Sequence, residues 1–327
     1  MPSPDSRKVV LVGTGMVGMS YAYALLNQNA CDQLILIDIN RKRALGEAMD
    51  LNHGLAFSGS HMKIYAGDYS DCKDADIVAI CAGVAQKPGE TRLDLLSRNA
   101  EVFSSIIGPV LSSGFRGIFL VATNPVDIMS HITHRLSGFA PSRVIGTGTA
   151  LDTARLRYLL GDTFQVDPRN MHAYVIGEHG DSEFVPWSQA MLATFPILGL
   201  CEKLPACSLA QMREIEEEVR GAAYQIIEAK NATYYGIGMA MVRITKAIFG
   251  DENCVLTVSA MLQGEYGLSG TYIGVPCILS RKGIREILTL PLTEKEQEQL
   301  KNSFDSLMEL SSSLALKPIK NTKSAEQ

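Results

Sequence analysis

The sequence feature that most constrains the fold is a glycine-rich run, GTGMVG, at residues 13–18. It follows a short apolar stretch and precedes a helical pattern over Met16–Asn27. In a G-x-G-x-x-G turn of this kind, Gly13 and Gly15 let the backbone turn tightly and approach a pyrophosphate at the helix N-terminus. Gly18 lets the helix pack closely against the strand. The run therefore predicts a phosphate-binding strand–turn–helix unit.

An acidic residue follows at the spacing expected of a dinucleotide site. Asp38 ends the second predicted strand, twenty residues after Gly18, where its carboxylate can accept from both ribose hydroxyls of an adenosine. The same carboxylate would repel a 2′-phosphate, so NAD is predicted in preference to NADP. Arg41 and Arg43 would favour a 2′-phosphate, but both lie early in a predicted helix and are interpreted as exposed. A glycine-rich turn with an incidental acid is the simpler alternative.

The first half of the chain alternates short β-rich runs with longer helical patterns. Several runs are almost continuously apolar, as expected of parallel strands covered on both faces. The expected strands are Lys8–Gly13, Leu34–Asp38, Lys63–Ala66, Asp76–Ala82, Ile118–Thr123 and Val144–Gly146. The expected helices are Met16–Asn27, Arg41–Leu55, Leu93–Ser112 and Val126–Leu136. This order predicts an α/β domain over residues 1–148, built on a doubly wound parallel sheet of the Rossmann type.

The second half has mixed patterns, and residues 149–316 are expected to form a second, mixed α+β catalytic domain. Its predicted elements are the strands Ala173–Ile176 and Val255–Leu262 and the helix Leu209–Lys230. Thr293 and Glu296 form a capping box before a last amphipathic helix. The polar tail, residues 317–327, is expected to be flexible.

The composition excludes several classes of function. The 327 residues carry a net charge of −5 without a basic tract, which argues against a nucleic-acid or anionic-membrane partner. The longest apolar stretch, Ile77–Ala85, is far too short for a membrane helix, and no apolar signal region precedes the first strand. Seven scattered cysteines without a C-x-x-C pair favour reduced thiols over a disulfide framework or zinc. A folded cytoplasmic protein is expected.

His179 is the candidate proton carrier. It lies between two glycines in the segment IGEHGDS, at the end of a predicted strand, and no other histidine of the sequence has such a setting. A nicotinamide reaction needs a group that takes or gives a proton as hydride moves. His53, His61, His131 and His134 lie in helical or turn patterns and are interpreted as surface or packing residues. The His131–His134 pair has metal-like spacing, but no third ligand is evident nearby in the sequence, so no metal site is predicted.

Asp152 and Arg155 form a second candidate pair. They are three residues apart at the start of a predicted helix, so they share a face. A buried aspartate near His179 would fix the imidazole tautomer and stabilise the imidazolium, and an arginine on that face offers a planar fork for a substrate carboxylate. An ordinary helix salt bridge explains the same spacing equally well.

Six segments carry a resemblance that spans nearly the whole chain. They are GTGMVG at 13–18, QKPGETRLDLLSRN at 86–99, ATNPVD at 122–127, GTGTALDTARLR at 146–157, GEHGDSE at 177–183 and ATYYGI at 232–237. In this order and at these spacings they resemble the lactate/malate dehydrogenase family, and its bacterial L-lactate dehydrogenase branch in particular. The resemblance implies reversible reduction of pyruvate to L-lactate by hydride transfer from NADH.

The family implies catalytic roles for matching positions. His179 would be the proton donor and acceptor, and Asp152 would be its partner. Arg92, carried on the Gly- and Pro-containing loop 86–92, would close over the substrate and polarise the ketone. Charge that develops on the substrate oxygen needs preorganised donors, and loop closure would expel water from around them.

The family also implies the substrate contacts. Arg155 would hold the substrate carboxylate in a bidentate pair, Asn124 would donate a hydrogen bond to the reacting oxygen, and Thr233 would line the pocket. The discriminating position is Gln86, where malate enzymes resemble one another in carrying arginine. A neutral amide tolerates the methyl group of pyruvate, whereas the second carboxylate of oxaloacetate would be enclosed without a counter-charge. Malate and other 2-hydroxy acids remain the alternative substrates.

The same resemblance implies the contacts with NAD. They extend from the glycine-rich turn to residues that follow the later strands of the first half. The implied cofactor-binding residues are Gly13, Gly15, Val17, Gly18, Asp38, Arg43, Tyr69, Gly83, Val84, Ser105, Ala122, Thr123, Asn124 and Thr147.

A second anion site is expected on another face of the helix that carries Arg155. Arg155 and Arg157 are two residues apart, so on a helix they point about 200° away from each other. Bacterial relatives that respond to fructose 1,6-bisphosphate resemble this chain in having Arg157 and His172, which meet across a subunit boundary in that family. The resemblance implies a homotetramer activated by the bisphosphate. A solvated arginine is the simpler alternative.

A catalytically silent NAD-binding protein on the same fold is the alternative of a different class. Such a protein would not need His179, Asp152, Arg155 and Arg92 together. Their joint presence favours an enzyme.

Overall fold

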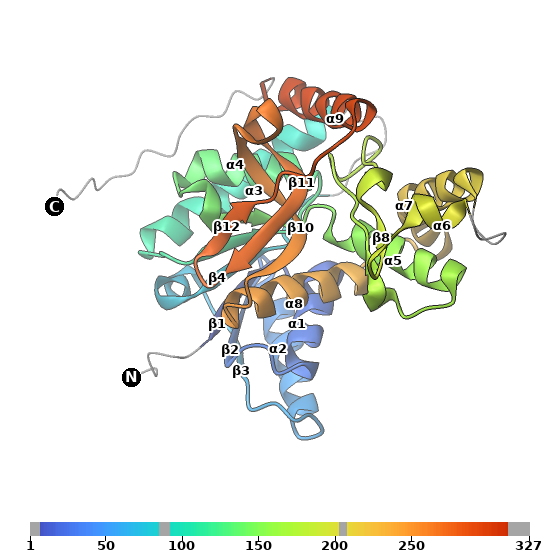
Figure 1. The fold of residues 1–327 in the computed structure, drawn as a ribbon. Coiled ribbons are helices and arrows are strands. Elements are labelled where there is room, and N and C mark those ends of the chain that lie inside the picture. The colour runs from blue at the N-terminus through green and yellow to red at the C-terminus, as the bar shows by residue number, and fades with distance from the viewer. Residues whose placement is uncertain (1–6, 85–91, 203–207, 313–327) are drawn as a thin grey trace.

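One large sheet organises the molecule (Figure 1). The computed structural model describes residues 7–84, 92–202 and 208–312. Its strands are β1 (Lys8–Val12), β2 (Gln33–Ile37), β3 (Lys63–Ala66), β4 (Ile77–Ile80), β5 (Ile118–Val121), β6 (Val144–Gly146), β10 (Cys254–Gln263), β11 (Ser269–Ser280) and β12 (Gly283–Ile287). Their order across the sheet is β12-β11-β10-β6-β5-β4-β1-β2-β3.

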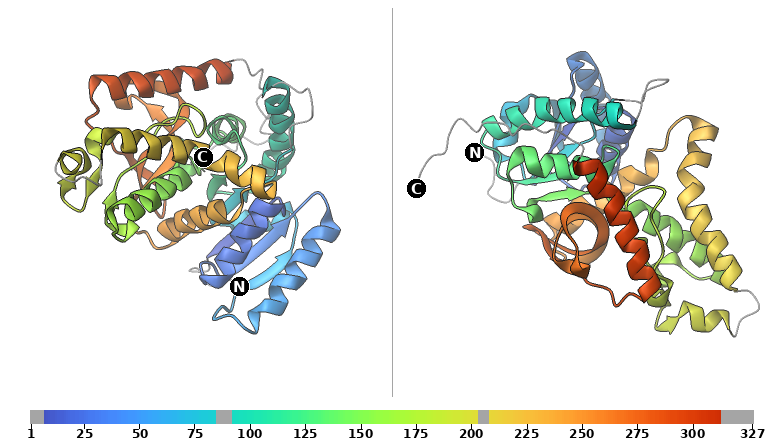
Figure 2. Two further views of the ribbon diagram at one scale, coloured as in Figure 1. Left: turned by 90° about the vertical axis from the view of Figure 1, so that its right-hand side faces the viewer. Right: turned by 90° about the horizontal axis from the view of Figure 1, so that it is seen from above.

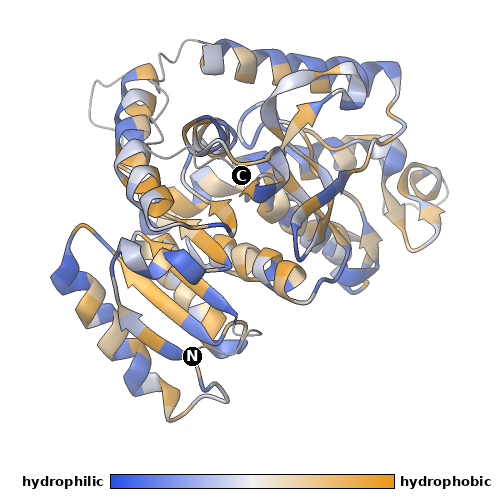
Figure 3. Ribbon diagram, turned by 90° about the vertical axis from the view of Figure 1, so that its left-hand side faces the viewer, coloured by the Kyte–Doolittle hydropathy of each residue, from blue (hydrophilic) through white to orange (hydrophobic). Residues whose placement is uncertain are grey.

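The strands β1 to β6 are parallel, and the chain order reverses at β1. That strand pairs with β2 on one side, Val9 facing Leu34, and with β4 on the other, Val9 facing Ile77. β1, β4 and β5 are buried along their whole length, as the continuous apolar runs predicted. In Figure 3 the central strands are largely orange, whereas the amphipathic helix at the top alternates blue and orange. The predicted doubly wound parallel sheet is confirmed.

Helices from both halves pack on this sheet. Those of the first half are α1 (Met16–Asn27), α2 (Arg41–Leu55), α3 (Arg92–Ser112) and α4 (Val126–Ser137), close to their predicted bounds. α1 also packs against α8 (Tyr235–Phe249) of the second half. The two helices approach closely because Gly238 has no side chain: a Cβ there would lie 2.8 Å from the Ser20 carbonyl carbon. The Tyr21 hydroxyl and Thr245 Oγ1, 2.7 Å apart, form a buried hydrogen bond between them.

The second half extends the same sheet with antiparallel strands. β10 pairs with β6 through Ser259 and Gly146, and β11 and β12 follow as a meander. The helices here are α5 (Ala150–Phe164), α6 (Ile197–Cys201), α7 (Leu209–Lys230) and α9 (Glu294–Ser312). Figure 2 shows α5 and α7, in green and yellow, packed together in the second half. The mixed α+β character expected of this half is confirmed.

The remaining elements are short. β7 (Met171–His172), β8 (Met191–Leu192) and β9 (Phe195–Pro196) form a small antiparallel sheet. The 3₁₀ helices are Tyr69–Asp74, Pro141–Arg143, Pro168–Asn170, Trp187–Gln189 and Glu265–Gly267. The predicted strand Ala173–Ile176 is wrong: only Ile176 pairs, in a single bridge with Phe184. Its apolar residues are buried in a loop whose backbone bonds are made individually, a pattern that apolar periodicity does not distinguish from a strand.

The last helix begins as its capping box predicts. Glu296 Oε2 accepts from the Thr293 backbone nitrogen at 2.9 Å, and the Glu296 backbone nitrogen donates to Thr293 Oγ1 at 3.4 Å. The carboxylate of Glu296 also accepts from Ser188, so the start of α9 is tied to the 3₁₀ helix Trp187–Gln189. The buried face of α9 includes Leu300, Phe304 and Leu307.

The cysteines differ in part from the sequence expectation. Cys31, Cys72, Cys81, Cys254 and Cys277 are free thiols. Cys201, at the end of α6, is disulfide-bonded, so the expectation of reduced thiols is wrong there. An odd total of cysteines excludes a fully paired framework, but it does not exclude a disulfide between two of them. None of the described helices is long and apolar enough to cross a lipid bilayer.

Candidate active site

The glycine-rich turn has the geometry that a bound pyrophosphate needs. Gly13 has a φ of 101°, and a Cβ there would lie 2.5 Å from the backbone nitrogen of Ala82. Gly18 faces the carbonyl oxygen of Gly13, with no room for a side chain between α1 and β1. Gly15 caps α1, and nothing lies within 4 Å of where its Cβ would be. The open space at Gly15 is where a phosphate can approach the N-terminus of α1.

Asp38 stands at the end of β2, next to this turn. Its Oδ2 accepts from the backbone nitrogen of Thr14 at 2.8 Å and from Thr14 Oγ1 at 2.9 Å, and its Oδ1 accepts from Asn40 at 2.8 Å. Burial would raise the pKa of Asp38, but these hydrogen bonds outweigh it and hold the pKa below its ordinary value. The residue is therefore a carboxylate at neutral pH. Its charge fits a ribose with two free hydroxyl groups.

The other positions implied for the cofactor lie along the same edge of the sheet. Because the strands are parallel, the residues that follow β1 to β6 meet at one edge, where doubly wound sheets bind their ligands. These residues are Asp38 after β2, Tyr69 after β3, Gly83 and Val84 after β4, Ala122, Thr123 and Asn124 after β5, and Thr147 after β6. Val17 lies in the first turn of α1, Arg43 in the first turn of α2, and Ser105 on the exposed face of α3.

His179 and Asp152 are bonded to each other, although they belong to different elements. Asp152 lies in the first turn of α5 and is 1% exposed. His179 lies on the turn between Ile176 and Phe184, and its Nδ1 is 2.7 Å from Asp152 Oδ2. The second half therefore holds its two candidate catalytic side chains within one hydrogen bond.

Arg155 completes this cluster on the same face of α5. Its Nη1 donates to Asp152 Oδ1 at 2.6 Å, so one carboxylate joins the imidazole and the guanidinium. Burial would raise the pKa of Asp152, but His179 and Arg155 outweigh it and hold the pKa below its ordinary value. Burial would lower the pKa of His179, but Asp152 outweighs it, and the pKa is raised to about 9.

The turn that carries His179 is anchored from the first half of the chain. Asp127, in the first turn of α4, accepts from the backbone nitrogen of His179 at 2.8 Å and from Ser259 Oγ on β10. It is 1% exposed, and burial raises its pKa to about 6 despite these two donors. Sequence reasoning quoted Asp127 within the segment ATNPVD but gave it no role, because its partners are distant in sequence.

A cavity of about 310 Å³ collects the candidate catalytic and substrate-binding residues. Asn124, Asp152, Arg155 and His179 line it, with apolar walls from Leu95, Leu96 and Ile227. Glu183 and Arg220 also line it, and sequence reasoning did not single them out. Thr233 lies between α7 and α8 and does not line the cavity as described. Gln86 lies outside the described residues, as do the tail 317–327 and the side chain of Arg92, which begins α3.

Arg157 points away from this cavity, as the helix geometry predicts. Its Nε donates to the Ala173 carbonyl oxygen at 3.0 Å, and its guanidinium lies 5.2 Å from the ring centre of Tyr174. Burial lowers the pKa of Arg157 below its ordinary value. It lines a separate cavity of about 400 Å³, which also includes Arg243. His172 is exposed on β7, next to Ala173.

Comparison with known families covers both halves of the chain. Residues 7–146 match the lactate/malate dehydrogenase NAD binding domain, and residues 149–314 match the lactate/malate dehydrogenase alpha/beta C-terminal domain. Among curated proteins, an L-lactate dehydrogenase of Priestia megaterium is 53% identical over 93% of this chain and 96% of its own. L-lactate dehydrogenase 1 of Peribacillus psychrosaccharolyticus is 52% identical over 95% of this chain and 98% of its own.

Solved structures agree with this assignment. A lactate dehydrogenase from a Medee basin deep-sea metagenome, MGS-M5, superposes with a TM-score of 0.93 at 52% identity, covering 94% of this chain and 98% of that one. The minor L-lactate dehydrogenase of Enterococcus mundtii in its ligands-bound form superposes with a TM-score of 0.94 at 46% identity, covering 96% and 100%. The chain therefore belongs to the lactate/malate dehydrogenase family, as an NAD-dependent oxidoreductase similar to the bacterial L-lactate dehydrogenases.

Proposed function

We propose that this enzyme reduces pyruvate to L-lactate with NADH, with His179 as the proton donor and Arg155 as the carboxylate-binding residue. The observation that carries the proposal is that the buried carboxylate of Asp152 is bonded both to His179, at 2.7 Å, and to Arg155, at 2.6 Å, at one cavity. A 2-oxo acid has a carboxylate next to the ketone that is reduced. The two cationic side chains suit these two adjacent groups.

Asp152 prepares His179 for proton donation. Because Nδ1 is bonded to Asp152, Nε2 is the ring nitrogen that a substrate oxygen can approach. The pKa of about 9 keeps the imidazole protonated at neutral pH, as a donor to a ketone oxygen must be. NADH, when bound, supplies the hydride. In lactate oxidation the same nitrogen takes the proton back.

Further residues of the cavity would bind and polarise the substrate. Arg155 offers a planar guanidinium group to the substrate carboxylate, and its hydrogen bond to Asp152 fixes the orientation of that group. Asn124 would donate its side-chain amide to the reacting oxygen, and Arg92 would complete the donor set from the start of α3. These donors gain strength when water is excluded from around the developing negative charge.

Gln86 would set the preference for pyruvate over oxaloacetate, since a neutral side chain leaves a second substrate carboxylate without a counter-charge. The test is NADH oxidation with each 2-oxo acid. Pyruvate is expected to exceed oxaloacetate in kcat/KM by about a hundredfold or more. The opposite order would identify a malate dehydrogenase. Tight NADH binding without oxidation of NADH by any 2-oxo acid would identify a silent NAD-binding protein.

Fructose 1,6-bisphosphate would activate the enzyme through Arg157 and His172. Support comes from the orientation of Arg157, away from the substrate cavity, and from its bond to Ala173, the residue after the exposed His172. The guanidinium groups of Arg157 from two subunits would repel each other until an anion is bound. Millimolar bisphosphate should therefore lower the pyruvate concentration at half-saturation and raise the thermal midpoint. Indifference of both quantities would exclude this regulation.

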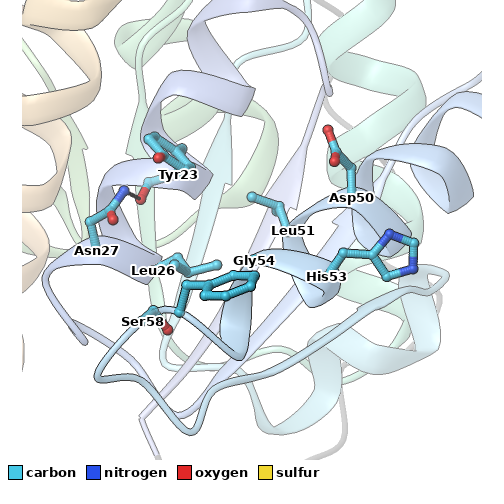
Figure 4. A pocket seen from close by; sticks show the side chains of 9 residues that line it. Tyr23, Leu26, Asn27, Asp50, Leu51, His53, Gly54 and Ser58 are labelled. Carbon is cyan, nitrogen blue, oxygen red and sulfur yellow. Dashed lines mark hydrogen bonds between the residues drawn. The ribbon is translucent and has the colours of Figure 1, made fainter.

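The active assembly would be a homotetramer in the cytoplasm. Exposed apolar side chains of the first half support a subunit contact: Tyr23 is 61% exposed and Phe57 is 94% exposed. Both line a hollow between α1 and α2, where Leu26 and Leu51 lie at its base (Figure 4). Light scattering should give about four times the chain mass of 35.5 kDa. The five free thiols support a reducing compartment, whereas the disulfide at Cys201 does not.

A further inference from the structure

Glu183 is a buried carboxyl group beside His179 that the proposed reaction does not use. It is 5% exposed, and its Oε2 lies 3.8 Å from His179 Nδ1. That separation is too long for a hydrogen bond, and Oε2 has no hydrogen-bond partner in the described part of the chain. Buried polar atoms nearly always have a partner, so an exception at a candidate active site calls for a physical reason.

The two nearest arginines, Arg220 and Arg155, donate their hydrogen bonds to groups other than the Glu183 carboxyl group. Arg220 on α7 donates Nη2 to the backbone oxygen of Glu183 at 3.0 Å and to Glu216 Oε1 at 3.3 Å. Its Nε is buried without a partner among the described residues. Arg155 donates to Asp152. Within the described ranges, neither arginine donates a hydrogen bond to the Glu183 carboxyl group, although both lie near enough to act on it through their charge.

Glu183, Asp152 and His179 share one small space. One oxygen or nitrogen atom from each lies within 4.8 Å of the other two. Two carboxyl groups this close repel each other when both are ionised, and an imidazolium beside them is attracted to both. Their protons are therefore distributed over the three groups together, as in other coupled sites.

The charged groups around His179 belong to several elements. Asp152 and Arg155 face it from α5, Asp127 from α4 and Arg220 from α7; Glu178 and Glu183 belong to its own turn. Burial raises the pKa of Glu183 to about 8, and the charge of Asp152 adds to the rise. His179, Arg155 and Arg220 oppose it. Glu183 in turn contributes to the raised pKa of His179.

We propose that Glu183 is a positioning residue that acts through His179, and that its carboxyl group sets the pH at which the imidazole holds the reacting proton. The inference rests on the proposed role of His179. When Glu183 is ionised, its charge stabilises the imidazolium across 3.8 Å. The imidazole then keeps its proton to a higher pH than Asp152 alone would allow. A neutral side chain of the same shape would remove this effect and leave the Asp152 bond in place.

The decisive variant is Glu183→Gln, with Glu216→Gln as its matched control. Glu216 is a carboxylate on α7 that accepts from Trp187 Nε1 and Arg220 and forms no hydrogen bond or ion pair with His179. Glu183→Asp keeps a carboxyl group and serves as the conservative rescue. The rate at which diethyl pyrocarbonate acylates His179 is measured against pH on the full-length protein, by mass spectrometry of the peptide that carries it. Only the neutral imidazole reacts, so the midpoint of this curve reports the proton affinity of His179.

In Glu183→Gln the midpoint is expected to fall by about one pH unit, a tenfold loss of proton affinity. In Glu216→Gln the midpoint should stay at the wild-type value, and in Glu183→Asp it should lie close to the wild-type value because the carboxyl group is kept. The alkaline limb of pyruvate reduction and the acid limb of lactate oxidation should move down by the same amount. A merely structural role would change rates or thermal midpoints without moving both limbs together.

An unchanged acylation midpoint in a folded Glu183→Gln protein would overturn the inference. If Glu183→Gln does not fold, Glu183→Ser takes its place. An acylation midpoint of Glu183→Ser equal to that of the wild type would then overturn the inference. The acylation curve needs no substrate. A shifted midpoint in an enzyme that does not reduce pyruvate would therefore contradict the proposed function and not the role of Glu183.

Discussion

At the scale of single residues, Asp152 decides the electrostatics of the site. A carboxylate that is 1% exposed is tolerated because both of its oxygens are engaged, one by Arg155 and one by His179. The same two bonds fix the guanidinium fork and the ring orientation. One side chain thus couples carboxylate binding to proton donation, and its removal should affect both.

Asp152→Asn keeps the volume of the side chain and removes its charge. The imidazolium loses its main counter-charge, and the amide favours the wrong tautomer of His179. We expect kcat for pyruvate reduction to fall by about a thousandfold or more, and its alkaline limb to move to lower pH. Steady-state rates measured across pH check both effects. Asp162→Asn, on the exposed far end of α5, is the control. Wild-type turnover in Asp152→Asn would contradict the assigned pair.

Local spacing predicts only part of this site. The pairing of Asp152 with Arg155 follows from three-residue spacing on a helix: the salt bridge forms and both side chains line the cavity, while the substrate-binding role of Arg155 stays a prediction. Glu183 and Asp127 could not be found in this way. Each owes its importance to a neighbour on another element, and a single sequence gives no distance between elements.

At the scale of elements, the start of α1 separates two functions of glycine. Gly18 has no room for a side chain because the carbonyl oxygen of Gly13 lies against it, whereas Gly15 faces open space. Gly18 is required by packing between α1 and β1. Gly15 is required only if a ligand approaches the N-terminus of α1.

Substitution by alanine should distinguish these two roles. Gly18→Ala is expected to lower the thermal midpoint by several degrees, because α1 must move away from β1. Gly15→Ala should keep the wild-type midpoint without cofactor but weaken NADH binding by about tenfold or more. Calorimetry of the cofactor-free protein and a fluorescence titration with NADH provide the two measurements. Equal effects of both substitutions on stability would count against the phosphate-binding role of Gly15.

The elements that sequence patterns predict best are regular helices and the parallel strands. α1, α2 and α7 have their predicted bounds, and the parallel strands differ from prediction by at most two residues at an end. The patterns fail where the backbone is irregular. Gly177 makes two hydrogen bonds with Gly274, and Ile176 one bridge with Phe184, so the segment before His179 is held by distant partners. β11 and α8 were not predicted, since their burial depends on β10 and α1.

At the scale of the whole molecule, the site lies where the two halves meet. Asp127 from the first half holds the backbone of His179 and the side chain of Ser259, and Ser259 pairs with Gly146 where β10 joins β6. The proton carrier is therefore anchored to the sheet that carries the predicted NAD site. Relative motion of the two halves would break this contact, so we expect the halves to unfold together.

The same buried groups should make the stability of the whole protein depend on pH. Asp127, Glu183 and His179 have pKa values raised to about 6, 8 and 9. Each binds its proton more tightly in the folded state than in the unfolded chain. Their stabilising effect is therefore complete at low pH and is lost as the pH rises through these values.

We expect the thermal midpoint to fall by about 5 °C between pH 6 and pH 9, at constant protein concentration because an oligomer would otherwise change it. Glu183→Gln should show a shallower fall, since its neutral amide has no proton to lose, while Glu216→Gln should follow the wild type. Scanning calorimetry at several pH values gives both slopes. A midpoint that rises from pH 6 to pH 9 would show that Glu183 and His179 do not hold their protons in the folded state, and that His179 is neutral where the proposed reduction needs it charged.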